Sequence, residues 1–151
     1  RWAGREEIGV QRLVKEAVSG SPTLLHLDFH PNNVLIDGDA VTGVIDWSGA
    51  TAGDRRADLA RAIVLLRQFQ LETELDWQRI AAAEFEVSMT VAYERSKGKM
   101  PEMDRFLAWA WAFTFHDQAN KLTGESSFRP SARRMEILER ELRSARRKLG
   151  V

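Results

Sequence analysis

The most unusual segment of the chain reads His26-Leu27-Asp28-Phe29-His30-Pro31-Asn32-Asn33. Short apolar runs flank it at 23–25 and 34–36, and a third run follows at 41–45. Each run is rich in Leu or β-branched residues and is too short for a stable helix, so we predict three short strands. Gly38 lies between the second and third runs, where it favours a tight turn. These features predict one small β-hairpin next to the unusual segment.

The remainder of the chain has the periodicity of helices. Apolar residues recur at helical spacing in five segments, and we expect helices over 6–19, 54–70, 76–98, from Pro101 through 106–113, and over 131–149. In the third helix, Asp76 is the predicted N-cap and Gly98 the predicted C-cap. Its apolar stripe consists of Trp77, Ile80, Ala81, Phe85, Met89 and Ala92. The run 106–113 is apolar all round, which predicts a central place in the core. The predicted fold class is therefore α+β, mostly α.

Composition narrows the possible classes of function. The 151 residues are 44% apolar and 29% charged, which is typical of a globular domain, so we predict a single domain over 1–151. Lys plus Arg and Asp plus Glu each number 22. The formal net charge is therefore zero and does not attract nucleic acid or an anionic membrane, so we expect neither as a partner. No apolar run approaches the ~20 residues that span a bilayer. No signal-peptide segment is evident, and the absence of cysteine fits a reducing cytoplasm; we expect a cytoplasmic protein.

The segment 26–33 and Asp46 together have the residue types that phosphoryl transfer needs. Asp46 follows Asp28 by 18 residues and ends the third predicted strand. One carboxylate must orient an acceptor hydroxyl and take its proton. Oxygen ligands must hold Mg²⁺ against the phosphates of ATP. A loop with Asp and Asn that faces a second Asp across a hairpin can supply both functions.

Two other interpretations of this segment remain open. Asp, Asn and Pro are turn formers, so the segment taken alone would be an ordinary turn. His26, Asp28 and His30 alternate, and on an extended strand they would share a face, as ligands of a zinc ion do. Pro31 and the two asparagines after it favour a loop instead, and the sequence has no second ligand cluster, since His116 is the one further histidine.

The spacing of the motifs resembles that of a known family. His26-x-Asp28-x-x-x-x-Asn33 has the spacing of the kinase catalytic loop, and Asp46 falls where kinases place the metal-binding Asp. The segments Ile45-Asp46-Trp47, Gly53-Asp54 and Asp58-Leu59-Ala60 are similar to the aminoglycoside phosphotransferase and choline-kinase-like superfamily. The match covers roughly 24–62, and three motifs in order form a strong signal. Leu27 and Asn32 depart from the pattern, because the family commonly has small residues there, often Gly.

The resemblance implies a role for each matched residue. Asp28 would be the catalytic base, and His26 would fix the catalytic loop by hydrogen bonds. Asn33 and Asp46 would be Mg²⁺ ligands and part of the ATP site. Asp58 would accept hydrogen bonds from backbone N–H groups of the catalytic loop.

The resemblance also implies a fold and a missing partner. The fold would be a protein-kinase-like C-terminal lobe whose small β-hairpin carries the catalytic and metal loops. Leu35 and Ile45 would form the apolar floor beneath the adenine of ATP. The chain has no G-x-G-x-x-G arrangement, no run of strands before Leu24 and no initial Met. We therefore expect that an N-terminal ATP-binding lobe is absent from this chain and that the lobe alone is inactive. We also expect self-association through the exposed interlobe surface.

The activity that the resemblance implies is transfer of the γ-phosphoryl group of ATP, with Mg²⁺, to a hydroxyl of a small acceptor such as an aminoglycoside or amino alcohol. A kinase-like binding or regulatory module without catalysis is the alternative, and the joint presence of Asp28, Asn33 and Asp46 favours the enzyme. A protein kinase is disfavoured because 45–48 reads Ile-Asp-Trp-Ser instead of containing Asp-Phe-Gly. Acidic residues crowd 72–86; they would suit a cationic acceptor, although an exposed acidic helix is the simpler interpretation.

Overall fold

The computed structural model describes residues 7–124 and 129–151, so the predicted helix start at Glu6 and the residues before it lie outside the described part. The helices are α1 (Ile8–Ala17), α2 (Arg55–Glu72), α3 (Asp76–Lys97), α4 (Met103–Thr123) and α5 (Ala132–Leu149). The strands are β1 (Thr23–Leu25), β2 (Val34–Asp37), β3 (Ala40–Val44) and β4 (Thr51–Gly53). The predicted α+β, mostly α class is confirmed. Within the described residues, no helix combines the length and apolar character needed to cross a membrane.

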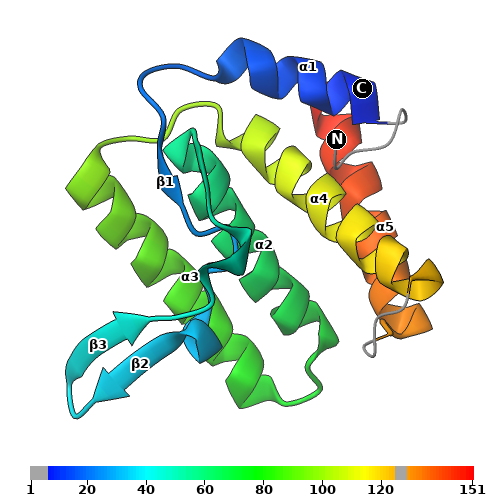
Figure 1. The fold of residues 1–151 in the computed structure, drawn as a ribbon. Helices are drawn as coiled ribbons and strands as arrows, with labels where there is room; N and C mark the ends of the chain where they lie inside the picture. Colours follow the sequence, from blue (N-terminus) through cyan, green and yellow to red (C-terminus); the bar gives the residue numbers. More distant parts are fainter. Residues whose placement is uncertain (1–6, 125–128) are drawn as a thin grey trace.

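The helices pack around α2 and α4. α2 contacts α3 on one side and α4 on the other, and α4 in turn contacts α5 and α1 (Figure 1). The run 106–113 is at the centre of this arrangement, as predicted. Its buried members are Phe106, Ala108, Trp109, Ala110, Trp111 and Ala112. They pack with Val64 of α2, Val10 of α1 and Leu138 of α5, so this core fixes α2 as the platform on which the loops are mounted.

The strands form two sheets, which differs from the single β element that we predicted. β2 pairs antiparallel with β3 as the expected hairpin, which projects from the helical body in Figure 1. β1 pairs antiparallel with β4, which the sequence did not reveal because Thr51-Ala52-Gly53 contains weak strand formers. β3 also lies one residue earlier than predicted. Asp46 therefore comes two residues after the strand and not at its end.

Two predicted helix ends need correction. We predicted that the fourth helix begins at Pro101. Glu102 has a left-handed backbone with φ of 58°, so α4 begins after Glu102, at Met103. Asp76 lies inside the first turn of α3, and Leu75 takes the N-cap position. Gly98 is the C-cap with φ of 81°, a conformation that glycine adopts without steric cost, and that prediction is confirmed.

The apolar stripe of α3 does not form a closed core. Trp77 and Ile80 are 66% and 58% exposed. Phe85 lines one cavity between α2 and α3, and Met89 lines another. Ala82 is the buried residue of this helix. α3 thus covers α2 incompletely and leaves space next to the loops described below.

Candidate active site

The first turns of α2 hold the segment 26–33 in place. Asp54 caps this helix by accepting a hydrogen bond from the backbone N–H of Arg56 at 3.0 Å. One turn later, Oδ1 of Asp58 accepts the backbone N–H groups of His26 and Leu27, at 3.0 and 2.7 Å. The predicted contact of Asp58 with the catalytic loop is confirmed. A carboxylate that accepts two backbone N–H groups fixes the peptide planes on both sides of a residue.

Leu27 has a left-handed backbone, with φ of 62°. Such a conformation strains any residue with a Cβ, which fits the small residue that the resemblance implies at this position. Arg61 compensates by donating from Nε to the Leu27 carbonyl oxygen at 3.1 Å. The loop is therefore held on the N–H side by Asp58 and on the C=O side by Arg61.

Sequence reasoning missed Arg61 as a residue of the site. It is buried, hydrogen bonds to Thr114 and lies 4.6 Å from the Phe113 ring centre. Burial lowers the pKa of Arg61 to about 10, against the opposing effect of Asp28 and Asp117, so the guanidinium remains protonated at neutral pH. The sequence feature that could have identified Arg61 is its position three residues after Asp58, which places both side chains on the same face of the helix.

Asp28 is oriented but accessible. Its side chain is 42% exposed and lies 3.9 Å from Nη2 of Arg61. Nδ2 of Asn33 donates to the Asp28 carbonyl oxygen at 2.9 Å and reaches its Oδ2 at 3.4 Å. Nε2 of His30 is 3.7 Å from the same Oδ2. Asp28 thus offers solvent a carboxylate whose neighbours limit its movement.

His26 connects the segment 26–33 to the Asp46 turn. It is buried, and its Nδ1 accepts the backbone N–H of Asp28 at 3.2 Å. Since Nδ1 is an acceptor, the proton is on Nε2, which donates to the Ile45 carbonyl oxygen at 2.9 Å. The ring also packs on Trp47, with 4.6 Å between ring centres. The imidazole joins the two loops and donates its one N–H to backbone.

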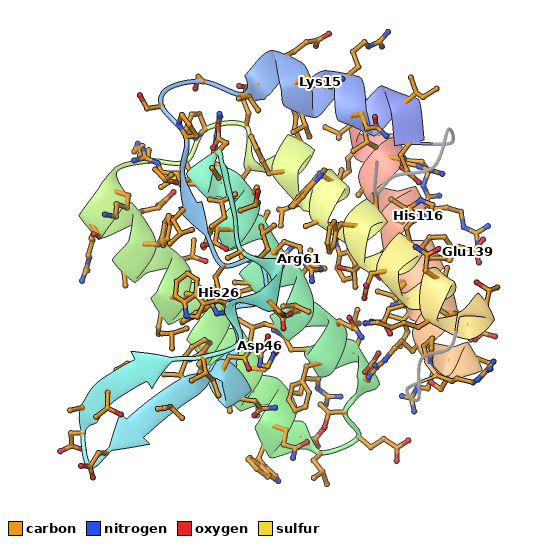
Figure 2. The ribbon with its side chains drawn as sticks, viewed as in Figure 1. Lys15, His26, Asp46, Arg61, His116 and Glu139 are labelled. Carbon is orange, nitrogen blue, oxygen red and sulfur yellow. The ribbon has the colours of Figure 1, made fainter. Side chains whose placement is uncertain are left out.

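Asp46 also has a left-handed backbone, with φ of 59°. The Ser48 hydroxyl donates to Oδ1 of Asp46 at 2.6 Å. This hydrogen bond, followed by one from the Ser48 backbone, lowers the pKa of Asp46, and His26 and His30 add a smaller electrostatic effect in the same direction. Figure 2 shows Asp46 and His26 in the same region, above the β2–β3 hairpin. Asp46 is therefore a solvent-exposed carboxylate that stays ionised to a lower pH than an ordinary aspartate does.

The donor set fits Mg²⁺. The amide nitrogen of Asn33 is committed to Asp28, which leaves its oxygen as the atom that can face a cation. This oxygen and the ionised carboxylate of Asp46 are hard ligands, which Mg²⁺ prefers together with water and phosphate. The backbone N–H of Ile45 donates to the Asn33 carbonyl oxygen at 2.9 Å and brings the two loops together. In the described ranges, no group of three or more His, Cys, Asp or Glu is arranged for a metal ion.

The predicted adenine floor is on the exposed face of the hairpin region. Leu35 and Ile45 are 47% and 44% exposed. Ile36, Val41 and Trp47 are also exposed in this region. Leu35 and Ile36 are consecutive in β2 and therefore point to opposite faces of the hairpin, so both faces expose apolar side chains to solvent.

Comparison with known proteins decides the family. The model of the phosphotransferase enzyme family matches residues 9–109, which include both loops, β4, α2 and α3. The chain belongs to this phosphotransferase family. The resemblance drawn from the motifs is thereby confirmed.

The curated relative that matches is hygromycin-B 4-O-kinase from Escherichia coli. It is 51% identical over 37 residues, which is 24% of this chain and 11% of the relative. The aligned part thus spans about a tenth of the relative's length. No solved structure matches the chain.

Proposed function

We propose that the protein transfers the γ-phosphoryl group of ATP to a hydroxyl of a small-molecule acceptor. The observation that carries this proposal is the position of Asp28, an accessible carboxylate on a loop that Asp58, Arg61 and Asn33 hold rigidly. Rigid placement of the base is the main protein contribution to phosphoryl transfer, where positioning and electrostatics dominate. Membership of the phosphotransferase family supports the same reaction class.

Asp28 orients the acceptor and takes its proton in this proposal. The acceptor oxygen forms a bond to the γ-phosphorus, while the bond from that phosphorus to the bridging oxygen of ADP breaks. The hydroxyl proton passes to Oδ1 or Oδ2 of Asp28. Arg61, 3.9 Å away, stabilises the ionised carboxylate before transfer and holds it in one orientation. His26 serves as a positioning residue, because its ring nitrogens are both bonded to backbone.

Asn33 and Asp46 would hold the Mg²⁺ ion, which neutralises phosphate charge when it is bound. The Ser48 hydrogen bond keeps Asp46 ionised and fixes Oδ1. The exposed apolar side chains of Leu35 and Ile45 would form one wall of the adenine site. A second lobe, which we expect to precede this chain in the complete protein, would supply the other wall.

The test is acceptor-dependent phosphorylation by the complete protein that includes this chain, with Mg²⁺ and γ-labelled ATP. The starting panel contains hygromycin B, choline, homoserine and uncharged hydroxyl compounds. The matched pair of variants is Asp28→Ala and Asp37→Ala, since Asp37 is an exposed carboxylate at the end of β2. We expect transfer to at least one acceptor in wild type and Asp37→Ala and its loss in Asp28→Ala. Tight binding of Mg²⁺ and ATP without transfer to any acceptor would contradict the proposed enzyme and support a binding module instead.

A further inference from the structure

A cavity of about 450 Å³ opens between α2 and α3, directly beside the catalytic loop. His30, Pro31 and Asn32 form its edge on the loop side. Leu66 and Phe69 of α2 and Phe85 of α3 are among the side chains that line its body. This volume is within the range of small-molecule sites, which are mostly apolar with a few polar groups.

His30 connects this cavity to Asp28. The imidazole lines the cavity, and its Nε2 is 3.7 Å from Oδ2 of Asp28. Both side chains are partly exposed, that of His30 to 28% and that of Asp28 to 42%. Asp28 itself is not part of the lining, so a molecule seated against Phe69 and Phe85 would present its hydroxyl to Asp28 past the His30 ring.

The charges at the cavity compensate each other. Glu72 and Arg134 both line it, and they form a bidentate ion pair with two distances of 2.7 Å. The acidic residues that crowd 72–86 are also largely paired with arginines. These pairs are Glu74 with Arg133, Asp76 with Arg79, and Glu86 with Arg67. Among the described residues that line the cavity, Glu72 is the one acidic residue, and Arg134 pairs with it, so the lining offers a polycationic acceptor no unpaired carboxylate.

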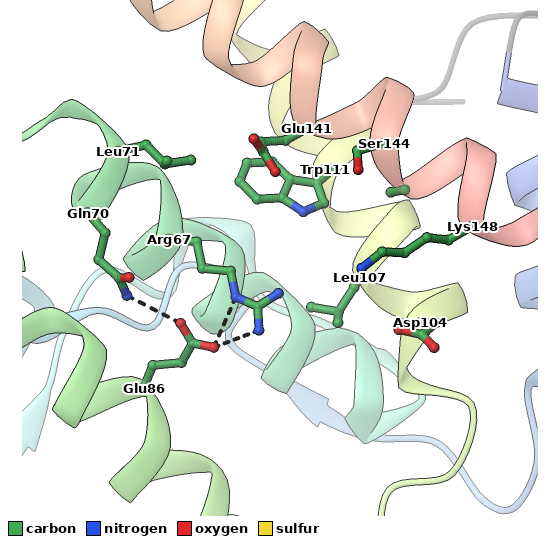
Figure 3. A pocket seen from close by; sticks show the side chains of 11 residues that line it. Arg67, Gln70, Leu71, Glu86, Asp104, Leu107, Trp111, Glu141, Ser144 and Lys148 are labelled. Carbon is green, nitrogen blue, oxygen red and sulfur yellow. Dashed lines mark hydrogen bonds and ion pairs between the residues drawn. The ribbon is translucent and has the colours of Figure 1, made fainter.

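A second cavity, of about 440 Å³, has a different character. Arg67, Glu86 and Lys148 line it together with Trp111, and Glu86 bonds to Arg67 and Gln70 (Figure 3). None of the residues 26–33 contributes to its lining. The cavity beside His30 is lined by three residues of the segment that carries Asp28, so it is the better of these two candidates for the acceptor.

We propose that the cavity between α2 and α3 binds the apolar part of an uncharged acceptor, whose hydroxyl then reaches Asp28. The class is a hydroxyl compound with an aromatic or aliphatic ring face and without positive charge. This inference rests on the proposed phosphotransferase function, and it narrows that function to one chemical class of acceptor. Phe69 and Phe85 are the residues that set this specificity.

The experiment compares acceptors and cavity variants in the complete protein. The uncharged probes are chloramphenicol and 4-nitrophenyl glucoside, and the charged probes are kanamycin and choline. We expect a higher kcat/KM for an uncharged probe than for either charged one. Phe85→Ala and Phe69→Ala should each raise the KM of that acceptor by on the order of tenfold, because each removes an apolar wall. The KM of ATP should not change.

Ile80→Ala is the matched control, because Ile80 is an exposed apolar residue of α3 outside the cavity lining. It should leave both KM values unchanged. Preference for kanamycin or choline would overturn the inference, as would phenylalanine variants whose acceptor KM equals that of wild type.

A binding measurement separates this inference from the proposed function. If no acceptor is phosphorylated, the proposed function fails, and calorimetric titration of the uncharged probes then decides about the cavity. If Phe85→Ala weakens the binding of an uncharged probe about tenfold and Ile80→Ala does not, the probe binds in the cavity as proposed. Absence of binding by both uncharged probes, or binding that ignores Phe85→Ala, overturns it.

Discussion

Leu27 and Asp46, two of the left-handed residues other than glycine, lie in the two loops of the site. Each is held by neighbours rather than by its own preference. Leu27 depends on Asp58 and Arg61, and Asp46 depends on Ser48. Local strain that the surroundings overcome is common at functional sites, and removing the neighbours is the direct way to test this.

Replacing Ser48 by Ala should raise the pKa of Asp46 toward its ordinary value of 3.8, because the strongest cause of the lowered pKa is the Ser48 side-chain hydrogen bond. The carboxyl resonance of Asp46, followed by NMR through an acid titration, reports this shift directly. Thr42→Ala is the control, since Thr42 is on β3 and its hydroxyl bonds to the Leu35 carbonyl oxygen instead. An unchanged Asp46 titration in Ser48→Ala would show that the hydrogen bond does not set the pKa.

Replacing Asp58 by Ala should loosen the catalytic loop, because two backbone N–H groups lose their shared acceptor. A lost charge-assisted hydrogen bond costs about 2 kcal/mol. We expect hydrogen exchange of the His26 and Leu27 amides to become about thirtyfold faster. Asp39→Ala, at an exposed hairpin position, should leave both amides unchanged. Equal exchange in Asp58→Ala and wild type would contradict the anchoring role.

Individual residues of the site could be predicted from the sequence where they belong to a motif of known spacing. The contact of Asp58 with the loop followed from the Asp58-Leu59-Ala60 motif, and the departure at Leu27 marked a position that favours glycine. Arg61 escaped notice because an arginine on a helix is usually solvated. Only the packing of α2 against α4, which places Thr114 and Phe113 beside it, buries its charge next to the loop.

At the scale of elements, Arg56 joins the start of α2 to the ends of two other segments. It forms an ion pair with Asp54, and it donates to the carbonyl oxygens of Ala17 at 2.7 Å and Pro101 at 3.2 Å. Its guanidinium also lies 4.4 Å from the ring centre of Phe106. One buried cation thereby connects α1, α2 and α4 at the end of α2 that carries the loops.

Arg56→Ala should lower the free energy of unfolding by about 3–5 kcal/mol, because it leaves the buried Asp54 carboxylate without its partner. Arg12→Ala is the control, since Arg12 is 70% exposed and forms only a 3.9 Å pair with Glu16. The control should cost less than about 1 kcal/mol. Urea unfolding measures both values, and similar costs for the two variants would contradict the connecting role.

The same ion pair predicts a dependence of stability on pH. Burial raises the pKa of Asp54, but hydrogen bonds from Arg56 and from the Ser19 backbone outweigh it, so the folded pKa is lowered below 3.8. The stabilisation is therefore fully present above the unfolded pKa and is lost as pH falls through the folded pKa. We expect the unfolding free energy to decrease below about pH 5. The decrease should be smaller in Asp54→Asn, and an identical pH profile of the two proteins would contradict this assignment.

The helices were more predictable than the strands because their periodicity extends over many residues. α2, α3 and α5 were placed to within two residues, and for α4 only the start was predicted, two residues early. β4 has three residues, of which Ala52 and Gly53 are weak strand formers, and its pairing partner is β1. The apolar stripe of α3 also shows that a sequence pattern predicts a helix better than it predicts how the helix packs. Its apolar spacing predicted a helix correctly, but its side chains line two cavities because α2 covers them only in part.

At the scale of the whole molecule, α2 is the common support of the site. Its first turns hold the catalytic loop, its middle packs in the core, and its later turns line the proposed acceptor cavity. The hairpin between the two loops brings Asn33 and Asp46 to the same region. We propose that the two aspartates have separate roles, in which Asp28 orients the acceptor and Asp46 binds Mg²⁺ at the ATP site.

The most direct test of this claim is steady-state kinetics of Asp28→Ala and Asp46→Ala in the complete protein, with the Mg²⁺ concentration varied. We predict that Asp28→Ala lowers kcat at least about 100-fold and leaves the KM of ATP nearly unchanged. Asp46→Ala should raise the Mg²⁺ concentration needed for half-maximal rate. An Asp28→Ala protein that keeps the wild-type kcat would contradict the account.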